Sequence, residues 1–346
     1  MNEALVALLD DPAVTDVLVN CGEVWVDRGA GLRRVNGLLG DAAEMRRLAQ
    51  QLASSAGRRL DDASPFVDGR LPDGTRLHAV LPPIARTGPH VSLRTFRRRA
   101  FTLDDLVNHG SIDPGGATVL AAIVAARLPY LVTGGTGTGK TTVLSTLLSL
   151  VPAAERLVIV EDAAELAPVH PHVVSLQARA ANVEGAGEIS LRELVRQALR
   201  MRPDRLVVGE CRGAEIVDLL GALNTGHEGG AATLHANSPA DVPARLEALG
   251  LLGSVPRAAL HALVGAALRA VVHLRRAADG SREIAEICVL DCHPEQRTTV
   301  VLTAWRRASG RVEPGGGLLD ELLAERGQEP PQPSGRWRYV PGKGWR

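Results

Sequence analysis

Short bursts of alternating apolar and polar residues run through the first hundred positions of the chain. Residues 13–36 alternate as VTDVLVN and then EVWVDR with glycines nearby, which predicts a hairpin or small sheet. A helix is predicted over 41–55, where apolar residues recur at helical spacing behind an aspartate that can cap the first turn. Two extended pieces around a Pro-Asp-Gly turn are predicted at 70–83, and another strand at 90–96. Residues 1–97 are therefore predicted to form a small α+β domain.

The hydrophobic pattern changes after residue 112. Helical segments now alternate with uninterrupted apolar runs, which lie at 130–134, 157–161, 205–210 and 231–236. Strands of this kind are buried on both faces, as in a parallel sheet covered by helices. Two further strands are predicted at 283–290 and 298–305, so we expect an α/β domain over 113–310. Residues 98–112 separate the two domains and are predicted to act as a hinge.

The composition excludes some classes of protein. The chain has 39 basic and 39 acidic residues, and only three Phe, two Tyr and four Trp, so binding of the whole chain to nucleic acid or to an anionic membrane is not expected. Four cysteines are too few for a disulfide scaffold, and no apolar stretch reaches the roughly 20 residues of a spanning helix. The acidic N-terminus lacks the pattern of a secretory signal. These features predict a cytoplasmic protein without a transmembrane segment, ending in a Pro-, Gly- and Arg-rich tail at 327–346 that is predicted to be disordered.

One internal lysine stands in a glycine-rich segment. Two of the 39 basic residues are lysines, and one of them, Lys140, lies in GGTGTGKTT, which fits the phosphate-binding pattern G-x-x-x-x-G-K-[ST] between an apolar strand and an apolar helix. Glycines let successive N–H groups face phosphate oxygens, Lys140 reaches the β- and γ-phosphates, and the Thr141 hydroxyl holds Mg²⁺. The predicted nucleotide-binding residues are Gly134, Gly135, Thr136, Gly137, Thr138, Gly139, Lys140, Thr141 and Thr142.

Polar residues follow three of the predicted buried strands. Glu210 ends one strand, at the edge where α/β proteins bind ligands, and is predicted to hold the Mg²⁺ shell or a water. Glu161, Asp162 and Glu165 follow another strand. One of them could polarise an attacking water, or all three could merely favour a helix N-terminus. His235 ends a third strand and either touches the γ-phosphate or is an ordinary structural residue.

Together these segments resemble the traffic ATPases of type II secretion, type IV secretion and type IV pili. That family has four ordered boxes, a P-loop, an acidic box, a Glu-type Walker B and a His box, and they match residues 134–142, 158–166, 202–213 and 224–239. The stretch NTGHEGGAATLHANSP, with the N-terminal pieces 15–32 and 68–96, is most similar to the tight-adherence, or Flp pilus, branch. The resemblance implies a PAS-like N-terminal α+β domain followed by a RecA-like P-loop domain with a mostly parallel sheet.

The resemblance also implies roles that the residues alone leave open. Glu165, the third carboxylate of the acidic box, looks like the catalytic base, Glu210 like the Walker B glutamate, and His235 like a γ-phosphate sensor. In this family the small domain supplies arginines that close over the nucleotide, because a guanidinium neutralises charge on the transferred phosphoryl group. The arginines that match those positions are Arg76, Arg86 and Arg94.

The implied function is that of an Mg²⁺-dependent ATPase working as a homo-oligomer, expected to be a hexamer, at the inner face of the cell membrane. Hydrolysis would swing the small domain and act on an inner-membrane platform protein, to assemble a pilus or secrete a protein. A conjugative DNA-transfer or helicase-like translocase is the alternative, and DNA-stimulated, salt-sensitive ATPase activity would distinguish it. A nucleotide-binding regulator with poor hydrolysis is a third hypothesis, which the intact candidates for base, metal ligand and sensor disfavour.

Overall fold

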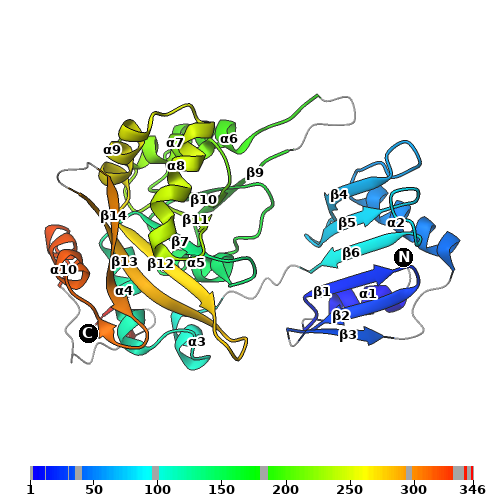
Figure 1. Ribbon diagram of the computed structural model, residues 1–346, viewed down its shortest axis with the longest axis horizontal. Helices are drawn as coiled ribbons and strands as arrows, with labels where there is room; N and C mark the ends of the chain where they lie inside the picture. Colours follow the sequence, from blue (N-terminus) through cyan, green and yellow to red (C-terminus); the bar gives the residue numbers. More distant parts are fainter. Residues whose placement is uncertain are drawn as a thin grey trace. The chain divides into compact units, whose positions relative to one another are not determined.

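The computed structural model describes residues 3–11, 13–29, 31–35, 41–95, 101–179, 186–293, 298–329, 339–340 and 344–345. The chain divides into two compact units, Met1–Arg99 and Ala100–Arg346, and each is described by itself (Figure 1). Residues 98–100 of the predicted hinge lie outside the described residues, as do 330–338, 341–343 and 346 of the predicted disordered tail.

The described part of the first unit contains a six-stranded antiparallel sheet with the strand order β3-β2-β1-β6-β5-β4. Each central strand buries alternate residues, such as Val17 and Leu77, against Met45 and Leu52 of the longer helix. The predicted cap is present, because Asp41 accepts a hydrogen bond from the backbone N–H of Glu44 at 2.8 Å. The elements are α1 (Glu3–Asp10), β1 (Asp16–Asn20), β2 (Glu23–Asp27), β3 (Leu32–Val35), α2 (Ala42–Ser55), β4 (Phe66–Arg70), β5 (Arg76–Val80) and β6 (His90–Arg94).

The second unit is built on a mixed sheet, which in the described residues has nine strands in the order β15-β14-β13-β12-β7-β11-β10-β8-β9. Strands β12 through β9 in this order run parallel, and β13 to β15 extend the sheet antiparallel. Its strands are β7 (Tyr130–Gly134), β8 (Leu157–Glu161), β9 (Val173–Gln177), β10 (Arg205–Cys211), β11 (Ala231–His235), β12 (Ala270–Arg276), β13 (Arg282–Cys292), β14 (Thr299–Arg306) and β15 (Gly310–Arg311).

Helices cover both faces of this sheet (Figure 1). One face packs on α3 (Leu103–Asn108), α4 (Pro114–Ala125), α5 (Lys140–Leu148) and α10 (Gly315–Glu325), and the other on α6 (Leu191–Ala198), α7 (Glu215–Leu223), α8 (Val242–Leu252) and α9 (Arg257–Ala267). Burial on both faces explains the solid apolar runs. Val207 packs in the core on the α4 and α5 side of the sheet, whereas Leu206 and Val208 pack in the core on the α6 and α7 side. The α/β architecture is confirmed, with an antiparallel extension of the predicted parallel sheet.

The described helices are at most 14 residues long. None of them alone is long and apolar enough to cross a membrane. One bent pair, Pro239–Leu252 and Arg257–Ala267, with an angle of 119° between its members, meets the requirement of length and composition only when both are counted together.

Candidate active site

The glycine-rich segment predicted to bind phosphate connects β7 to α5. Gly134 ends β7 with φ +147°, and a β-carbon there would lie 2.5 Å from the carbonyl oxygen of Leu274 in β12, so a glycine is required. Gly139 has φ +97° and directly precedes α5, which has no side-chain cap among the described residues. The first-turn N–H groups of α5 therefore lack a side-chain partner, which is the arrangement that binds phosphate at a helix N-terminus.

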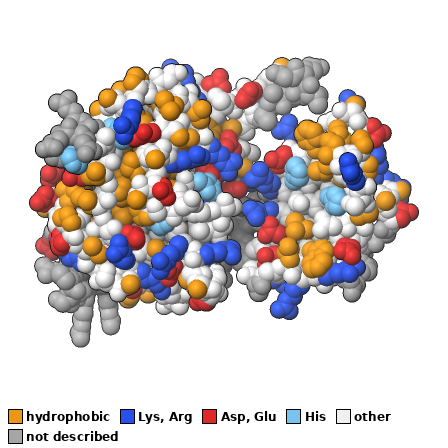
Figure 2. Space-filling view, viewed as in Figure 1, with side chains coloured by type: hydrophobic (Ala, Val, Ile, Leu, Met, Phe, Trp, Pro, Cys, Tyr) orange, Lys and Arg blue, Asp and Glu red, His pale blue; other side chains and the backbone are white. Residues whose placement is uncertain are grey.

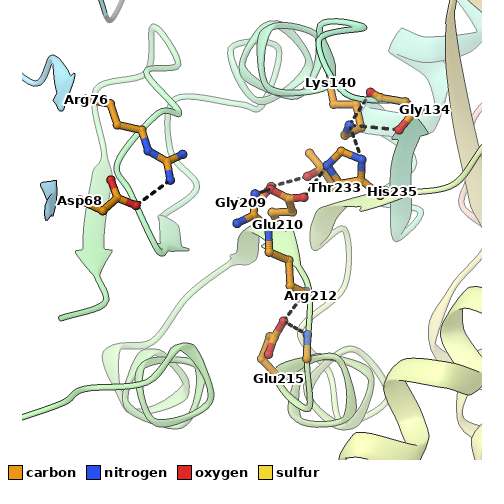
Figure 3. A network of polar contacts seen from close by, with 12 residues as sticks. Asp68, Arg76, Gly134, Lys140, Gly209, Glu210, Arg212, Glu215, Thr233 and His235 are labelled. Carbon is orange, nitrogen blue, oxygen red and sulfur yellow. Dashed lines mark hydrogen bonds and ion pairs between the residues drawn. The ribbon is translucent and has the colours of Figure 1, made fainter. Parts of the chain in front are cut away.

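Lys140 lies beneath this loop, only 7% exposed. Its Nζ donates hydrogen bonds to the carbonyl oxygens of Gly134 at 3.1 Å and Gly135 at 2.8 Å, and lies 3.5 Å from Nδ1 of His235 (Figure 3). Burial lowers the pKa of Lys140 from its usual value, and the Glu210 carboxylate partly opposes this effect. The ammonium thus bonds to the loop that carries the phosphate-binding N–H groups.

The threonines of the loop differ in their surroundings. Thr138 is buried, and its hydroxyl donates to the carbonyl oxygen of Gly135 at 2.9 Å, which closes the loop on itself. Thr136 is exposed. Thr141 and Thr142 are half-buried in the first turn of α5. Burial does not distinguish Thr141 from Thr142, so the choice of the Thr141 hydroxyl as the candidate oxygen for a metal rests on the spacing of the motif.

Two predicted residues from neighbouring strands meet beside Lys140. Nε2 of His235, at the end of β11, lies 2.7 Å from Oε1 of Glu210, near the end of β10 (Figure 3). The distance is that of an ion pair, but the atoms are not aligned as a hydrogen bond, and no described donor bonds to this buried oxygen. Because an ammonium only donates, Nδ1 of His235 is the acceptor facing Lys140, so the proton of a neutral ring is on Nε2, the nitrogen nearer to Glu210.

The electrostatics favour a neutral imidazole at this position. Burial, and then the charge of Lys140, lower the pKa of His235 from its ordinary value of 6.5, while Glu210 raises it by less. A neutral ring keeps Nδ1 available as an acceptor. Lys140, His235 and Glu210 therefore form one line of contacts from the start of α5 to the ends of β11 and β10.

An irregularity in β10 re-aims its last residues. Val208 and Cys211 both enter the same core although they are three residues apart, and the pairing of β10 with β11 shifts between them. Strict alternation would place their side chains on opposite faces of the sheet. The extra residue therefore shifts this alternation at Gly209 and Glu210. Gly209 is held by its carbonyl oxygen, which accepts from the Thr233 hydroxyl at 2.6 Å. A β-carbon on Gly209 would lie 2.5 Å from Cγ of Glu161.

The acidic box separates into a buried and an accessible carboxylate. Glu161, the last residue of β8, is 3% exposed, and its Oε1 accepts the backbone N–H groups of Glu165 and Leu166, both at 3.0 Å. Glu165 is half-buried and Asp162 is exposed. Glu161 therefore holds the backbone that presents Glu165, a positioning role that its sequence context did not reveal.

Two residues that were not predicted complete the acidic side of the site. Nη2 of Arg212 lies 2.6 Å from Oε2 of Glu210 (Figure 3). The buried carboxylate of Glu215 accepts the backbone N–H groups of Arg212 at 2.6 Å and Gly213 at 2.7 Å. The sequence signal was the Arg and Glu that follow Glu210 within five residues, a pattern equally typical of a solvated turn.

The oxygens present fit a magnesium ion. Carboxylate and hydroxyl oxygens are the ligands that Mg²⁺ takes in proteins, usually together with waters and phosphate oxygens. Glu210 Oε1 is buried and receives no hydrogen bond from the described residues, so the Glu210 carboxylate is not saturated with donors and keeps acceptor capacity for a metal or a metal-bound water. Thr141 supplies the matching hydroxyl at the start of α5.

The predicted arginines of the first unit lie on its sheet and on one loop. Arg76 of β5 and Arg94 of β6 are cross-strand neighbours, so both face the same side of the sheet. Arg94 Nε donates to Asp16 at 2.9 Å and Arg76 Nη2 to Asp68 at 3.1 Å. The third predicted arginine, Arg86, is exposed in the loop after β5 and does not join this pair.

The model of the type II/IV secretion system protein family matches residues 2–306. A Mycobacterium tuberculosis protein whose name provisionally assigns it to conjugal transfer is 55% identical over 322 residues, 91% of each chain. The conjugal transfer protein TrbB of Rhizobium radiobacter is 32% identical over 82% of this chain and 85% of its own. The type IV secretion system protein PtlH of Bordetella pertussis is 32% identical over 81% of this chain and 91% of its own.

Solved structures show a related fold. The ATPase DotB of Legionella pneumophila has a TM-score of 0.59 at 20% identity, covering 84% of this chain and 81% of its own. The pilus retraction motor PilT, solved with bound ADP, has a TM-score of 0.59 at 18% identity, covering 94% and 89%. The predicted secretion family and α/β fold are thereby confirmed, and the narrower tight-adherence branch stays a prediction.

Proposed function

This chain belongs to the family of type II/IV secretion system proteins, and from that premise we propose that it is an ATP-hydrolysing motor of a secretion, conjugation or pilus system. One observation carries the proposal: Lys140, His235 and Glu210 form a line of contacts at the end of a glycine-rich loop. An ammonium beside open helix N–H groups suits phosphate, and a carboxylate beyond it suits a metal and its waters.

The phosphate loop holds the nucleotide. The N–H groups between Gly134 and Gly139 and the first turn of α5 bind phosphate oxygens, and Lys140 exchanges its carbonyl partners for the β- and γ-phosphates. Thr141 and Glu210 hold Mg²⁺, directly or through water. When bound, Mg²⁺ neutralises charge on the phosphoryl oxygens.

Hydrolysis needs a base and a group that responds to the γ-phosphate. Glu165 takes the proton of the attacking water. The Glu161 carboxylate positions Glu165 by accepting the backbone N–H of Glu165. His235 contacts both Lys140 and Glu210, so loss of the γ-phosphate changes the partners on both sides of its ring. We propose that this change is the signal that leaves the site.

Steady-state ATPase activity of wild type, Glu165→Gln and Asp162→Asn tests the reaction and the base together. Glu165→Gln should lose turnover by about 10²-fold or more because an amide cannot accept the proton, while nucleotide binding and oligomer mass are unchanged. Asp162→Asn, at the same turn, is the matched control and should lose less than about tenfold. An unaffected Glu165→Gln would move the base to Glu210, and a monomeric wild type without turnover would contradict the motor.

The assembly follows from the family resemblance. The proposed domains are residues 1–97 and 113–310 joined by a hinge at 98–112, in a homo-hexamer that works at the inner face of the membrane with a platform protein. The resemblance implies that Arg94, Arg76 and Arg86 of the small domain contribute to the nucleotide site. Measuring oligomer mass with and without ATP tests the ring, and Arg94→Ala should lower kcat without changing that mass.

The transported substrate divides the proposal into two versions. Pilus assembly or protein secretion follows from the tight-adherence resemblance, whereas conjugal DNA transfer is favoured by the names of the relatives from M. tuberculosis and R. radiobacter. Basic and acidic side chains both occur on the visible face of each unit (Figure 2). ATPase activity measured with and without DNA distinguishes the versions: stimulation that falls steeply with salt supports DNA transfer, and its absence supports pilus or protein secretion.

A further inference from the structure

Arg212 lies in the most acidic part of the site. Its Nη2 is 2.6 Å from Oε2 of Glu210, and this contact raises the pKa of the guanidinium, with smaller contributions from the charges of Asp162 and Glu165. Glu210 lies in β10, and Asp162 and Glu165 follow β8. Without a positive charge at this position, they would repel one another and any nucleotide phosphate.

The backbone of Arg212 is fixed by hydrogen bonds, whereas its guanidinium is accessible to solvent. Glu215 accepts the backbone N–H groups of Arg212 and Gly213, so the turn after β10 is held by a buried carboxylate. The side chain itself is 57% exposed. An exposed guanidinium can leave a carboxylate at small cost, because solvent screens such pairs and hydrates both partners.

Both oxygens of Glu210 already have a neighbour. Oε1 faces Nε2 of His235, and Oε2 faces Arg212. A divalent cation or its water needs one of these oxygens, and Arg212, with its exposed side chain, is the neighbour that can move. The guanidinium and the cation therefore compete for the same carboxylate.

We propose that Arg212 is the resident counter-ion of Glu210, and that a divalent cation displaces it from Oε2 of this carboxylate. This inference rests on the proposed nucleotide site. It gives Arg212 a positioning role: the side chain keeps the acidic group receptive to phosphate before the metal arrives, and then yields Glu210 to the metal.

The proposal predicts effects of opposite sign. Without a divalent cation, Arg212→Gln leaves the carboxylates unneutralised, so nucleotide binding weakens. With Mg²⁺, the same variant removes the competitor for Glu210, so binding of the metal–nucleotide complex tightens. Each change should be about two- to fivefold, the scale of a largely exposed ion pair.

The experiment titrates the full-length protein with a fluorescent ADP analogue, once in EDTA and once in saturating Mg²⁺. Arg212→Lys keeps the charge and should stay near wild type in both conditions. Arg196→Gln is the matched control, since Arg196 is 52% exposed and pairs with Asp218 of α7 at 2.8 Å, as Arg212 pairs with Glu210. It should change neither dissociation constant.

The outcomes separate this inference from the proposed function. Opposite shifts in Arg212→Gln support the counter-ion role. Weakening in both conditions would make Arg212 a structural or phosphate-contacting residue, and unchanged constants would remove it from the site, so either result overturns the inference while the nucleotide site stands. A wild type that binds the analogue in neither condition overturns the nucleotide site and the inference together.

Discussion

Nε2 of His235 lies 2.7 Å from Oε1 of Glu210, so the last residue of β11 touches the glutamate near the end of β10. The other ring nitrogen faces Lys140 at 3.5 Å. A change in the charge of either neighbour therefore alters the protonation and the position of one imidazole.

The titration of His235 should limit the protein at acid pH. Burial and Lys140 lower its folded-state pKa below 6.5, so below that pH the unfolded chain binds more protons than the folded one, and stability falls. We expect the urea midpoint of wild type to drop more than that of His235→Gln between pH 7.5 and pH 5.5. Equal drops in the two proteins would contradict the lowered pKa.

Removing the carboxylate of Glu161 should affect turnover more than substrate binding. Glu161→Ala takes away the acceptor for the N–H groups of Glu165 and Leu166, which lets Glu165, the proposed base, move. We expect kcat to fall about 10- to 100-fold, the scale of a displacement near 1 Å, with KM within about twofold. Glu161→Gln keeps an oxygen acceptor and serves as the control in the same kinetic assay. Equal losses in the two variants would show that charge rather than the acceptor matters.

Two adjacent glycines should differ sharply in their tolerance of alanine. At Gly134 a β-carbon would meet backbone at 2.5 Å and the Thr138 hydroxyl at 2.8 Å, whereas at Gly135 its nearest neighbour is the Thr138 methyl carbon at 3.8 Å. Gly134→Ala should weaken nucleotide binding by about tenfold or more, because the loop must shift under strain. Gly135→Ala should bind within about threefold of wild type. A fluorescent-nucleotide titration of both variants decides, and similar affinities would contradict the steric argument.

Arg205 should matter for stability rather than for catalysis. It is 1% exposed and donates to Glu155 at 2.6 Å and to the carbonyl oxygen of Val124 at 3.1 Å. Arg205→Met should cost about 3 kcal/mol, near the lower end for one-sided loss of a buried pair, because Arg127 still contacts Glu155 at 3.0 Å. Urea denaturation measures this loss. The control Arg192→Met removes a half-exposed ion pair and should cost less than about 1 kcal/mol. Equal losses in the two variants would refute a structural role for the buried arginine.

Much of the second unit could be predicted from its hydrophobic pattern. The runs at 130–134 and 157–161 coincide with β7 and β8, because a strand covered on both faces leaves no polar positions to blur its limits. Strand β9 was not predicted. Its residues Val173–Gln177 lie at an edge of the sheet, half-buried or exposed, so they lack the solid apolar signal.

The site could be predicted only where a motif fixes the geometry. The phosphate loop follows from its spacing, since each glycine and Lys140 has a set place in the turn. Glu161 and Glu215 were beyond such reasoning, because each accepts N–H groups from a later or an earlier turn, and that contact depends on how the chain folds back. The role proposed for Arg212 likewise depends on charges that follow a different strand, which the order of residues along the chain does not reveal.

The extra residue in β10 separates the part of the strand that packs in the core from the part that contacts the candidate site. Up to Val208 the residues of β10 pack in the hydrophobic cores. Beyond Val208, Gly209 lies against Glu161 at the end of β8, and its carbonyl oxygen accepts a hydrogen bond from Thr233 of β11. A side chain at Gly209 would therefore leave every hydrophobic position of the strand intact and still displace the Glu161 carboxylate, which accepts the backbone N–H of Glu165. A substitution at this position would look conservative in the hydrophobic pattern, yet it would move the backbone that carries the proposed base.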